Sequence, residues 1–180
     1  MKTTKLLSIV LIALVFFITG CGTDPTMDGV ELTFDQEYKD MYINFKYPSE
    51  FTEKNGAVAS PLELQKIYEF RKDGKVTFVL KIEEYASDDA FTRVDEEIKK
   101  IEATYKDVNH KTVKGNKTKL DRYSYRASDS FGTDTLYYVY FGKYSYLGTT
   151  KIIKVYMINV EGRENFEKLF MPSFKLFNSR

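Results

Sequence analysis

Two segments in the second half of the chain, residues 136–141 and 152–160, carry apolar side chains at both odd and even positions. A strand with two apolar faces belongs in the middle of a sheet that is covered on both sides, because each face must be removed from water. These two segments constrain the fold more than any other feature. They require a central pair of strands and a covering layer on each face of the sheet.

Much of the remaining chain shows the two-residue period of half-buried strands. Met41, Ile43, Phe45 and Tyr47 alternate with more polar neighbours, and Pro48 ends this strand. Residues 48–62 show no period, so we expect a loop there, or a loop with one helical turn. Further strands are expected from Leu32 and Phe34 onward and at residues 67–70, 76–82, 108–113 and 120–126.

Asp73-Gly74 is a strong signal for a hairpin between residues 67–70 and 76–82. A two-residue loop would pair Phe70 with Thr77 and mix apolar and polar faces. A three-residue loop, residues 72–74, would instead pair Phe70 with Val76. We therefore predict the longer loop, with Gly74 in the left-handed conformation.

Two other segments have the period of a helix. A single apolar stripe predicts a long amphipathic helix that is capped by Ser87 or Asp88. The stripe consists of Phe91, Val94, Ile98, Ile101 and Tyr105. A second helix is expected at residues 163–171, ended by Pro172. Strands, a helix, strands and a helix, joined by short connections, predict an α+β domain: an antiparallel sheet flanked by helices.

The first 21 residues have the layout of a secretory signal, a short basic head followed by an apolar run. The run ends in Ile18-Thr19-Gly20-Cys21, which resembles the lipobox of bacterial lipoproteins. That resemblance implies cleavage after Gly20 and a diacylglycerol thioether on Cys21, whose amino group can also carry an acyl chain such as palmitate. The alternatives are an ordinary signal peptide or an anchor helix with an incidental cysteine. We favour lipidation because Cys21 is the only cysteine.

We divide the chain into a signal peptide (residues 1–20), the lipidated cysteine with a short tether (21–30) and a single α+β domain (31–180). Cleavage removes two lysines, so Lys+Arg falls from 27 to 25 against 26 Asp+Glu, a net charge of −1. This balance gives no argument for nucleic acid as a partner. The expected location is the extracytoplasmic face of a cell membrane, held by the lipid.

Several features of the domain occur together. Phe45-Lys46-Tyr47-Pro48 is followed by Phe51, a mid-chain amphipathic helix precedes tyrosine-rich strands, and the chain closes with residues 170–174, Phe-Met-Pro-Ser-Phe. In these features the domain resembles the PsbP/Mog/DcrB group, over roughly residues 31–177. The resemblance implies an α/β/α sandwich and a non-enzymatic role: assembling or stabilising a membrane complex, or binding a partner.

Few residues offer catalytic or metal-binding chemistry. His110 is the only histidine, and we expect a structural or surface role for it. Asp129 and Asp134 lie five residues apart in a turn and could offer oxygens to Ca²⁺, but a plain hairpin turn is favoured because no bidentate glutamate follows. No nucleophile elbow, phosphate loop or dinucleotide motif occurs. We therefore expect no catalytic set, no metal and no cofactor.

Four lysines, Lys111, Lys114, Lys117 and Lys119, gather on one predicted hairpin. They are a possible contact for anionic headgroups or wall polymers. The alternative, which we favour, is a lysine-decorated edge that blocks strand addition.

Four tyrosines, Tyr138, Tyr140, Tyr144 and Tyr146, form a possible partner surface, because exposed tyrosine is typical of recognition surfaces. The alternative, which we favour, is that they pack in the core.

These observations suggest a membrane-anchored extracytoplasmic lipoprotein whose domain is a non-catalytic binding or accessory module for an envelope protein or polymer. The alternatives are a small hydrolase that acts on envelope material and a small-ligand receptor. A concave pocket with converging titratable groups would indicate an enzyme, whereas a flat or grooved aromatic patch would indicate a module.

The lipobox yields the first testable prediction. Cys21→Ser should abolish labelling by a lipid precursor and release the protein into the medium or periplasm, because no other thiol can carry the lipid. Metabolic labelling and membrane fractionation measure both effects. Continued membrane labelling of the variant would contradict lipidation at Cys21.

Overall fold

The structure is a computed structural model that describes residues 26–55, 62–85, 89–128, 133–146 and 149–177. The predicted signal peptide, Cys21 and residues 22–25 lie outside this part of the chain. So do Ser87, Asp88 and most of the turn at residues 129–134.

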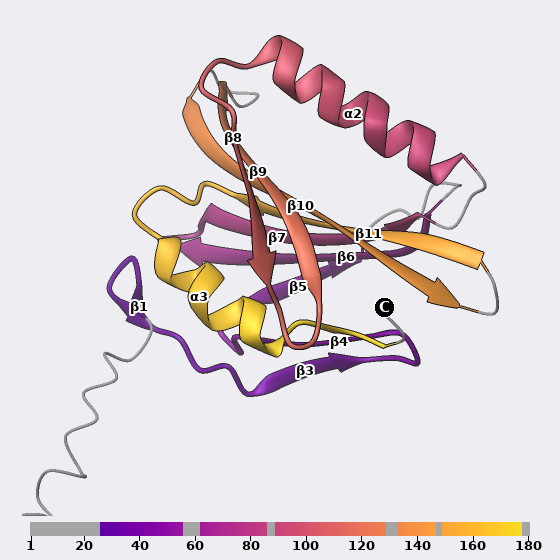
Figure 1. The fold of residues 1–180 in the computed structure, drawn as a ribbon. Helices are drawn as coiled ribbons and strands as arrows, with labels where there is room; N and C mark the ends of the chain where they lie inside the picture. The colour runs from indigo at the N-terminus through magenta and orange to yellow at the C-terminus, as the bar shows by residue number, and fades with distance from the viewer. Residues whose placement is uncertain (1–25, 56–61, 86–88, 129–132, 147–148, 178–180) are drawn as a thin grey trace, which may run out of the picture.

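A seven-stranded antiparallel sheet forms the centre of the fold (Figure 1). The order of its strands is β5-β6-β7-β11-β10-β9-β8. Their bounds are β5 Thr52–Asn55, β6 Leu62–Lys72, β7 Lys75–Tyr85, β8 Asn109–Lys114, β9 Lys119–Ser128, β10 Asp134–Tyr146 and β11 Thr149–Ile158. The two segments with apolar residues on both faces are thus β11, the middle strand, and its neighbour β10, as predicted.

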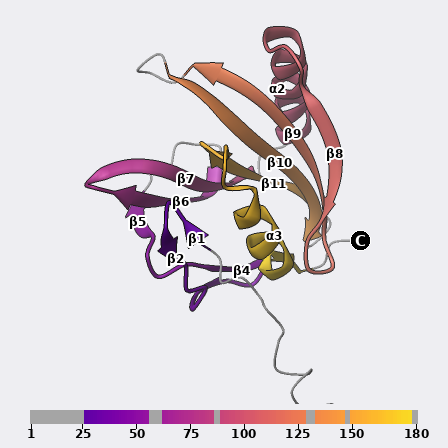
Figure 2. The same ribbon diagram turned by 90° about the vertical axis from the view of Figure 1, so that its left-hand side faces the viewer.

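Each face of this sheet has its own cover. Helix α2 (Ala90–Thr104) lies on one face. Helix α3 (Glu164–Ser173), the hairpin β1–β2 (Thr26–Met27 and Val30–Glu31) and a small sheet of order β12-β4-β3 lie on the other (Figures 1 and 2). The strands of the small sheet are β3 Gln36–Lys39, β4 Ile43–Tyr47 and β12 Lys175–Leu176. The predicted α+β class is therefore confirmed.

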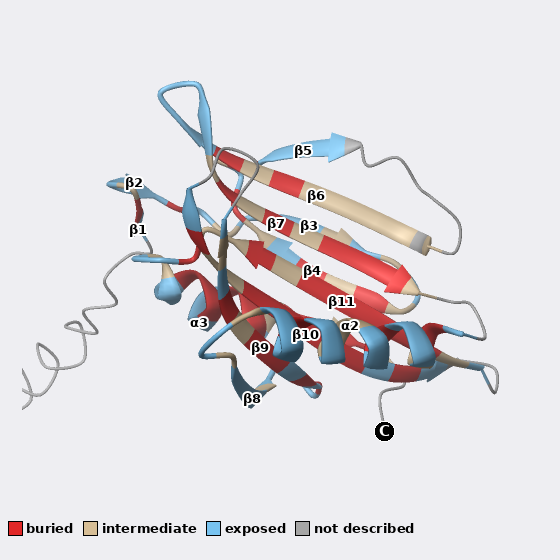
Figure 3. Ribbon diagram, turned by 90° about the horizontal axis from the view of Figure 1, so that it is seen from above, coloured by how far each residue is buried: buried red, intermediate tan, exposed pale blue. Residues whose placement is uncertain are grey.

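The larger core lies between the seven-stranded sheet and the α3 side, and it is rich in phenylalanine. Phe166 of α3 stands at its centre, with its ring 4.9 Å from that of Phe78 and 5.4 Å from that of Phe51. Phe45 of β4 packs against Phe174, which follows α3. Each fully buried phenylalanine contributes about 1.5–3 kcal/mol. Figure 3 shows the buried residues along β7, β11 and β10.

A smaller core lies beneath α2. The buried Val94 and Ile101 of the predicted stripe meet Val139 of β10 and Ile152 of β11. The other stripe residues, such as Ile98, are partly buried around them. Alternate residues of β10 and β11 thus supply the two cores, which explains why both faces of these strands are apolar.

The β6–β7 hairpin differs from the prediction. Lys72 pairs with Lys75, so the loop has two residues, Asp73 and Gly74, both with positive φ (51° and 76°). Phe70 nevertheless pairs with Phe78, because Thr77 is an extra, bulged residue on β7. The bulge thus places apolar residues opposite one another, which the prediction achieves with a longer loop instead.

Two predicted boundaries were also wrong near the N-terminus. The tether does not extend to residue 30, because β1–β2 folds onto the domain and Met27 is buried in the larger core at 2% exposure. Leu32 and Phe34 also pack on this core, but the next strand begins only at Gln36. Both residues are apolar because they pack on the core, and this does not require them to be in a strand.

Residues 48–62, predicted as a loop, contain the edge strand β5, which pairs with β6. Its sequence, Thr-Glu-Lys-Asn, shows no apolar period because an edge strand can be polar on both faces. At the other end of the chain, α3 includes Pro172 in its last turn and stops one residue later.

Gly142 on β10 tests the packing of the central strands. A Cβ at this position would clash with the side chain of Leu120 and lie 3.0 Å from Cγ2 of Ile153. Gly142→Ala should lower the free energy of unfolding by about 1–3 kcal/mol, measured by urea denaturation. Ser145→Ala, at an exposed position of the same strand, should change it by less than about 0.5 kcal/mol. Equal stabilities would contradict this packing.

Candidate functional site

An open groove of about 600 Å³ lies between α2 and the sheet, and we name it the α2 groove. The helix packs over β9, β10 and β11 and leaves the same face of β6 and β7 without a helix. The groove follows the edge where the helix ends its cover. Its lining residues are Leu62, Tyr85, Arg93, Val94, Glu96, Glu97, Lys100, Ile101, Tyr105, Tyr125 and Tyr156.

Tyrosines from three strands reach this groove because side chains alternate along a strand. Tyr85 of β7, Tyr125 of β9 and Tyr156 of β11 all point to the α2 face. Tyr105, just after the helix, stacks on Tyr125 with ring centroids 4.4 Å apart and planes at 12°. Tyr125 in turn stacks on Tyr137 at 5.4 Å. These rings hold one another in place and make a rigid wall.

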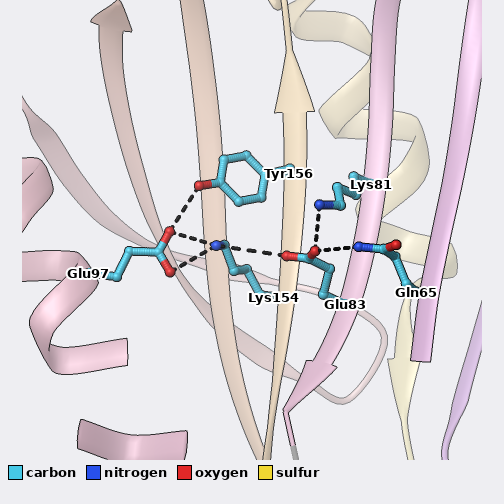
Figure 4. A network of polar contacts seen from close by, with 6 residues as sticks. All are labelled: Gln65, Lys81, Glu83, Glu97, Lys154 and Tyr156. Carbon is cyan, nitrogen blue, oxygen red and sulfur yellow. Dashed lines mark hydrogen bonds and ion pairs between the residues drawn. The ribbon is translucent and has the colours of Figure 1, made fainter. Parts of the chain in front are cut away.

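A chain of polar contacts begins at Glu97 and Tyr156, which line the α2 groove, and continues across the sheet (Figure 4). Lys154 of β11 donates to both carboxylate oxygens of Glu97, with Nζ at 2.6 and 2.8 Å. The Tyr156 hydroxyl donates to the same carboxylate at 2.9 Å. On the other side of Lys154, Oε2 of Glu83 is 3.8 Å from Nζ.

Glu83 of β7 continues this chain toward the sheet edge. Its Oε1 accepts hydrogen bonds from Lys81 at 2.5 Å and from Gln65 of β6 at 2.9 Å. The side chain of Lys154 is only 7% exposed and that of Glu83 only 6%. We call Gln65, Lys81, Glu83, Glu97, Lys154 and Tyr156 the Lys154 network. It joins α2 to three adjacent strands.

The protonation states follow from this geometry. Burial favours the neutral form of Glu83, but hydrogen bonds from Lys81 and Gln65 and the charges of Lys81 and Lys154 outweigh it and lower its pKa. Burial, and the charge of Glu97, raise the pKa of Tyr156. Burial also raises the pKa of Tyr125 to about 12. Tyr125 and Tyr156 are therefore neutral hydroxyls at neutral pH.

The rim of the α2 groove carries charges of both signs in an exposed position. Arg93, Glu96 and Lys100 lie along one side of the helix, where spacings of three and four residues bring side chains together. A concave aromatic wall with a polar rim is suited to binding an extended segment of another molecule. Within the described residues, no group of three or more His, Cys, Asp or Glu side chains could hold a metal ion.

Of the four tyrosines considered as a possible partner surface, three are buried, which agrees with the favoured interpretation that they pack in the core. Tyr138, Tyr140 and Tyr144 are 8%, 0% and 2% exposed. They share the face of β10 that meets the larger core, because they are two and four residues apart. The side chain of Tyr146 lies outside the described residues.

The predicted lysine cluster divides between two faces of the β8–β9 hairpin. All four lysines are exposed. Lys114 pairs with Lys119 across the strands, whereas Lys111 points to the α3 side, 3.9 Å from Glu167. Lys117 lies in the turn with φ 60°. The even separation needed for a common face is absent between Lys111 and Lys114.

Two other candidate residues have local partners. His110 is exposed on β8 and stacks on Tyr123 with centroids 4.6 Å apart. Asp134 forms an ion pair with Arg126 at 3.0 Å. The second aspartate of the possible Ca²⁺ site, Asp129, lies outside the described residues.

Sequence reasoning did not find the α2 groove, although one signal was present. Lys154 interrupts the apolar run of residues 152–158, and a lysine in such a position requires a buried counter-charge. Glu97 supplies this counter-charge. It lies 57 residues before Lys154 in the sequence, so no local pattern connects the two.

The strand order, the two covers and the groove define a class: an antiparallel α+β domain with a PsbP-like fold. Among solved structures, it is similar to the solution structure of cyanobacterial PsbP (CyanoP) from Synechocystis sp. PCC 6803, with a TM-score of 0.53 and 17% sequence identity. The match covers 87% of this chain and 100% of that one. At this identity the likeness shows the fold alone.

No family model matches the chain, and no curated protein matches it. In the described part of the chain, neither helix is long and apolar enough to cross a membrane.

The lowered pKa of Glu83 predicts a pH dependence of stability. A carboxyl whose pKa falls on folding stabilises the protein above its ordinary pKa of 4.5, and the contribution disappears as the pH falls through the lower, folded value. Glu83→Gln should therefore cost about 1–3 kcal/mol at pH 7 and progressively less below pH 4.5.

Urea denaturation of both proteins across this range measures the difference. Glu102→Gln, at an exposed position of α2, is the matched control and should show almost no difference at any pH. If the difference in free energy of unfolding between wild type and Glu83→Gln does not change with pH, the prediction is contradicted.

Proposed function

We propose that the protein is a membrane-anchored extracytoplasmic lipoprotein, and that its domain is a non-catalytic module that binds an envelope protein or polymer in the α2 groove. The observation that carries the proposal is the groove itself: a concave wall of stacked tyrosines with an exposed, charged rim. The lipobox-like sequence at residues 18–21 supports the location.

The arrangement of charges favours binding over chemistry. The titratable groups of the Lys154 network are engaged with one another, since Lys154 is held by Glu97 and Glu83. The ring hydroxyl of Tyr156 is committed to Glu97 as well. What remains for a ligand is the aromatic surface and the rim charges of Arg93, Glu96 and Lys100.

Stacked rings are suited to recognition for an energetic reason. A tyrosine that is already held by its neighbours loses little conformational freedom when a partner packs against it. Tyr105 and Tyr125 are held in this way. An extended chain that carries apolar and charged groups would match such a groove, whether it is a peptide segment or an envelope polymer.

Two adjacent lysines of α2 give a matched test. A photo-reactive residue in place of Glu96, at the rim, should crosslink a partner in intact membranes. Lys100→Glu should reduce this adduct about fivefold, equivalent to about 1 kcal/mol for an exposed charge contact. Lys99→Glu makes the same charge change at an exposed residue outside the groove and should leave the adduct unchanged.

The measurement is the yield of the adduct on a denaturing gel, with the adduct identified by mass spectrometry. A photo-reactive residue at position 95, exposed on the other side of α2, serves as the second control. Equal adducts from positions 95 and 96, or equal loss in both lysine variants, would contradict binding in the α2 groove.

A further inference from the structure

The outer surface of the small sheet presents a second hollow, of about 610 Å³, between β3, β4, β12 and the end of α3. Three lysines line it: Lys39, Lys46 and Lys175. They share this surface because Ile43 and Phe45, on the alternate positions of β4, point into the core. The register also places Lys39 and Lys175 on either side of Asn44. We call this surface the basic face.

The charge of the basic face is weakly compensated. One acidic residue, Glu37, lines the hollow, and it accepts a hydrogen bond from Asn44 at 2.6 Å. Within the described residues, Lys39, Lys46 and Lys175 form no ion pair. The β8–β9 turn, with the exposed Lys117, adjoins the hollow, since the Asn116 amide donates to the carbonyl of Phe174 at 2.9 Å.

Exposed apolar side chains line the hollow or lie in the turn that follows Lys39. Met41, in the turn between β3 and β4, is 72% exposed, and Leu169 of α3 is 37% exposed and lines the hollow. Pro172 is exposed beside it. Lysines that surround exposed apolar side chains are typical of surfaces that lie in the headgroup region of a bilayer, where the charges meet anionic lipid and the apolar groups enter the interface.

The position of this face relative to the N-terminus gives an independent argument. Asp28 of the β1–β2 turn forms an ion pair with Arg163, directly before α3. Ser173, at the other end of α3, lines the hollow. The ten residues of α3 span about 15 Å. The β1–β2 turn and the basic face therefore lie at the two ends of one short helix, on the same side of the sheet (Figures 1 and 2).

The connection between Cys21 and β1 is short. Four residues separate Cys21 from Thr26, where β1 begins, and such a connection extends about 18 Å at most. A lipid on Cys21 would thus hold the α3 side of the domain within reach of the headgroups. Helix α2, whose residues line the α2 groove, lies on the opposite face of the seven-stranded sheet (Figures 1 and 2).

We propose that the basic face docks on the anionic headgroups of the membrane that carries the lipid anchor, so that the α2 groove faces away from the bilayer and toward its partner. This inference rests on the anchor of the proposed function. It defines an orientation: α3 and the small sheet on the lipid, and α2 outward.

The test uses the full-length lipidated protein in vesicles. A fluorophore is attached to Met41→Cys, and in a separate protein to Asp95→Cys on exposed α2; Cys21 is blocked by its lipid. Nitroxide groups on the lipid headgroups quench a fluorophore that touches the membrane. With phosphatidylglycerol in the vesicles, we expect several-fold stronger quenching at position 41 than at position 95. Pure phosphatidylcholine or high salt should remove the difference.

Charge reversal provides the matched comparison. Lys46→Glu/Lys175→Glu should remove the quenching at position 41. The control is Lys99→Glu/Lys106→Glu, which changes one exposed lysine of α2 and one just beyond it. It makes the same change in net charge and should leave the quenching at position 41 unchanged. Circular dichroism checks that both variants fold.

The possible failures are distinct. Equal quenching at positions 41 and 95, or quenching that does not depend on anionic lipid, would overturn the docked orientation while the anchor stands. A fluorophore on Cys21 and protein that does not associate with membranes would overturn the anchor. In that case, binding of the Cys21→Ala chain to the same anionic vesicles tests the basic face alone, and absence of binding would overturn it.

Discussion

The structure depends on the burial of β11 on both faces. Its residues alternate between two separate cores, Ile152 beneath α2 and Ile153, Val155 and Met157 on the α3 side. Neither core closes without the strand, and the strand has no stable place at an edge. Because one face requires α2 and the other requires α3 with the small sheet, the layered architecture follows from a single hydrophobic constraint. It also separates two surfaces of different character, the α2 groove and the basic face.

Two buried lysines interrupt this strand: Lys151, which pairs with Glu84, and Lys154. A lysine among buried apolar residues costs several kcal/mol unless it is paired and hydrogen-bonded, and for Lys154 Glu97 and Glu83 supply the pairing. The apolar stripe of α2 allows some sliding along the sheet, whereas a bidentate contact between Glu97 and Lys154 has one position. We therefore regard the Lys154 network as the element that sets the placement of α2, and hence the shape of the α2 groove.

The two proposals concern opposite sides of the same sheet. Stacked tyrosines and a charged rim support partner binding beside α2, while lysines and exposed apolar side chains support contact with a bilayer beside α3. An anchor near Thr26 would bring the second surface to the membrane and leave the first accessible. The domain would then be a fixed platform that presents a groove, which suits the accessory role proposed for it.

Periodicity in the sequence predicted most of the strands, both helices, the central place of residues 136–141 and 152–160, and the α+β class, whereas the PsbP-like fold was implied by a resemblance. The features predicted from periodicity are local consequences of alternating burial, so the sequence by itself determined them. It did not determine β5, whose edge position needs no apolar period, or the bulge at Thr77, which depends on a match with Phe70 across the hairpin. Only the tertiary structure decided which core receives Tyr138, Tyr140 and Tyr144 and that Glu97 meets Lys154. The α2 groove was decided in the same way, because its walls come from segments far apart in the chain, and contact between such segments is set by packing rather than by any local pattern.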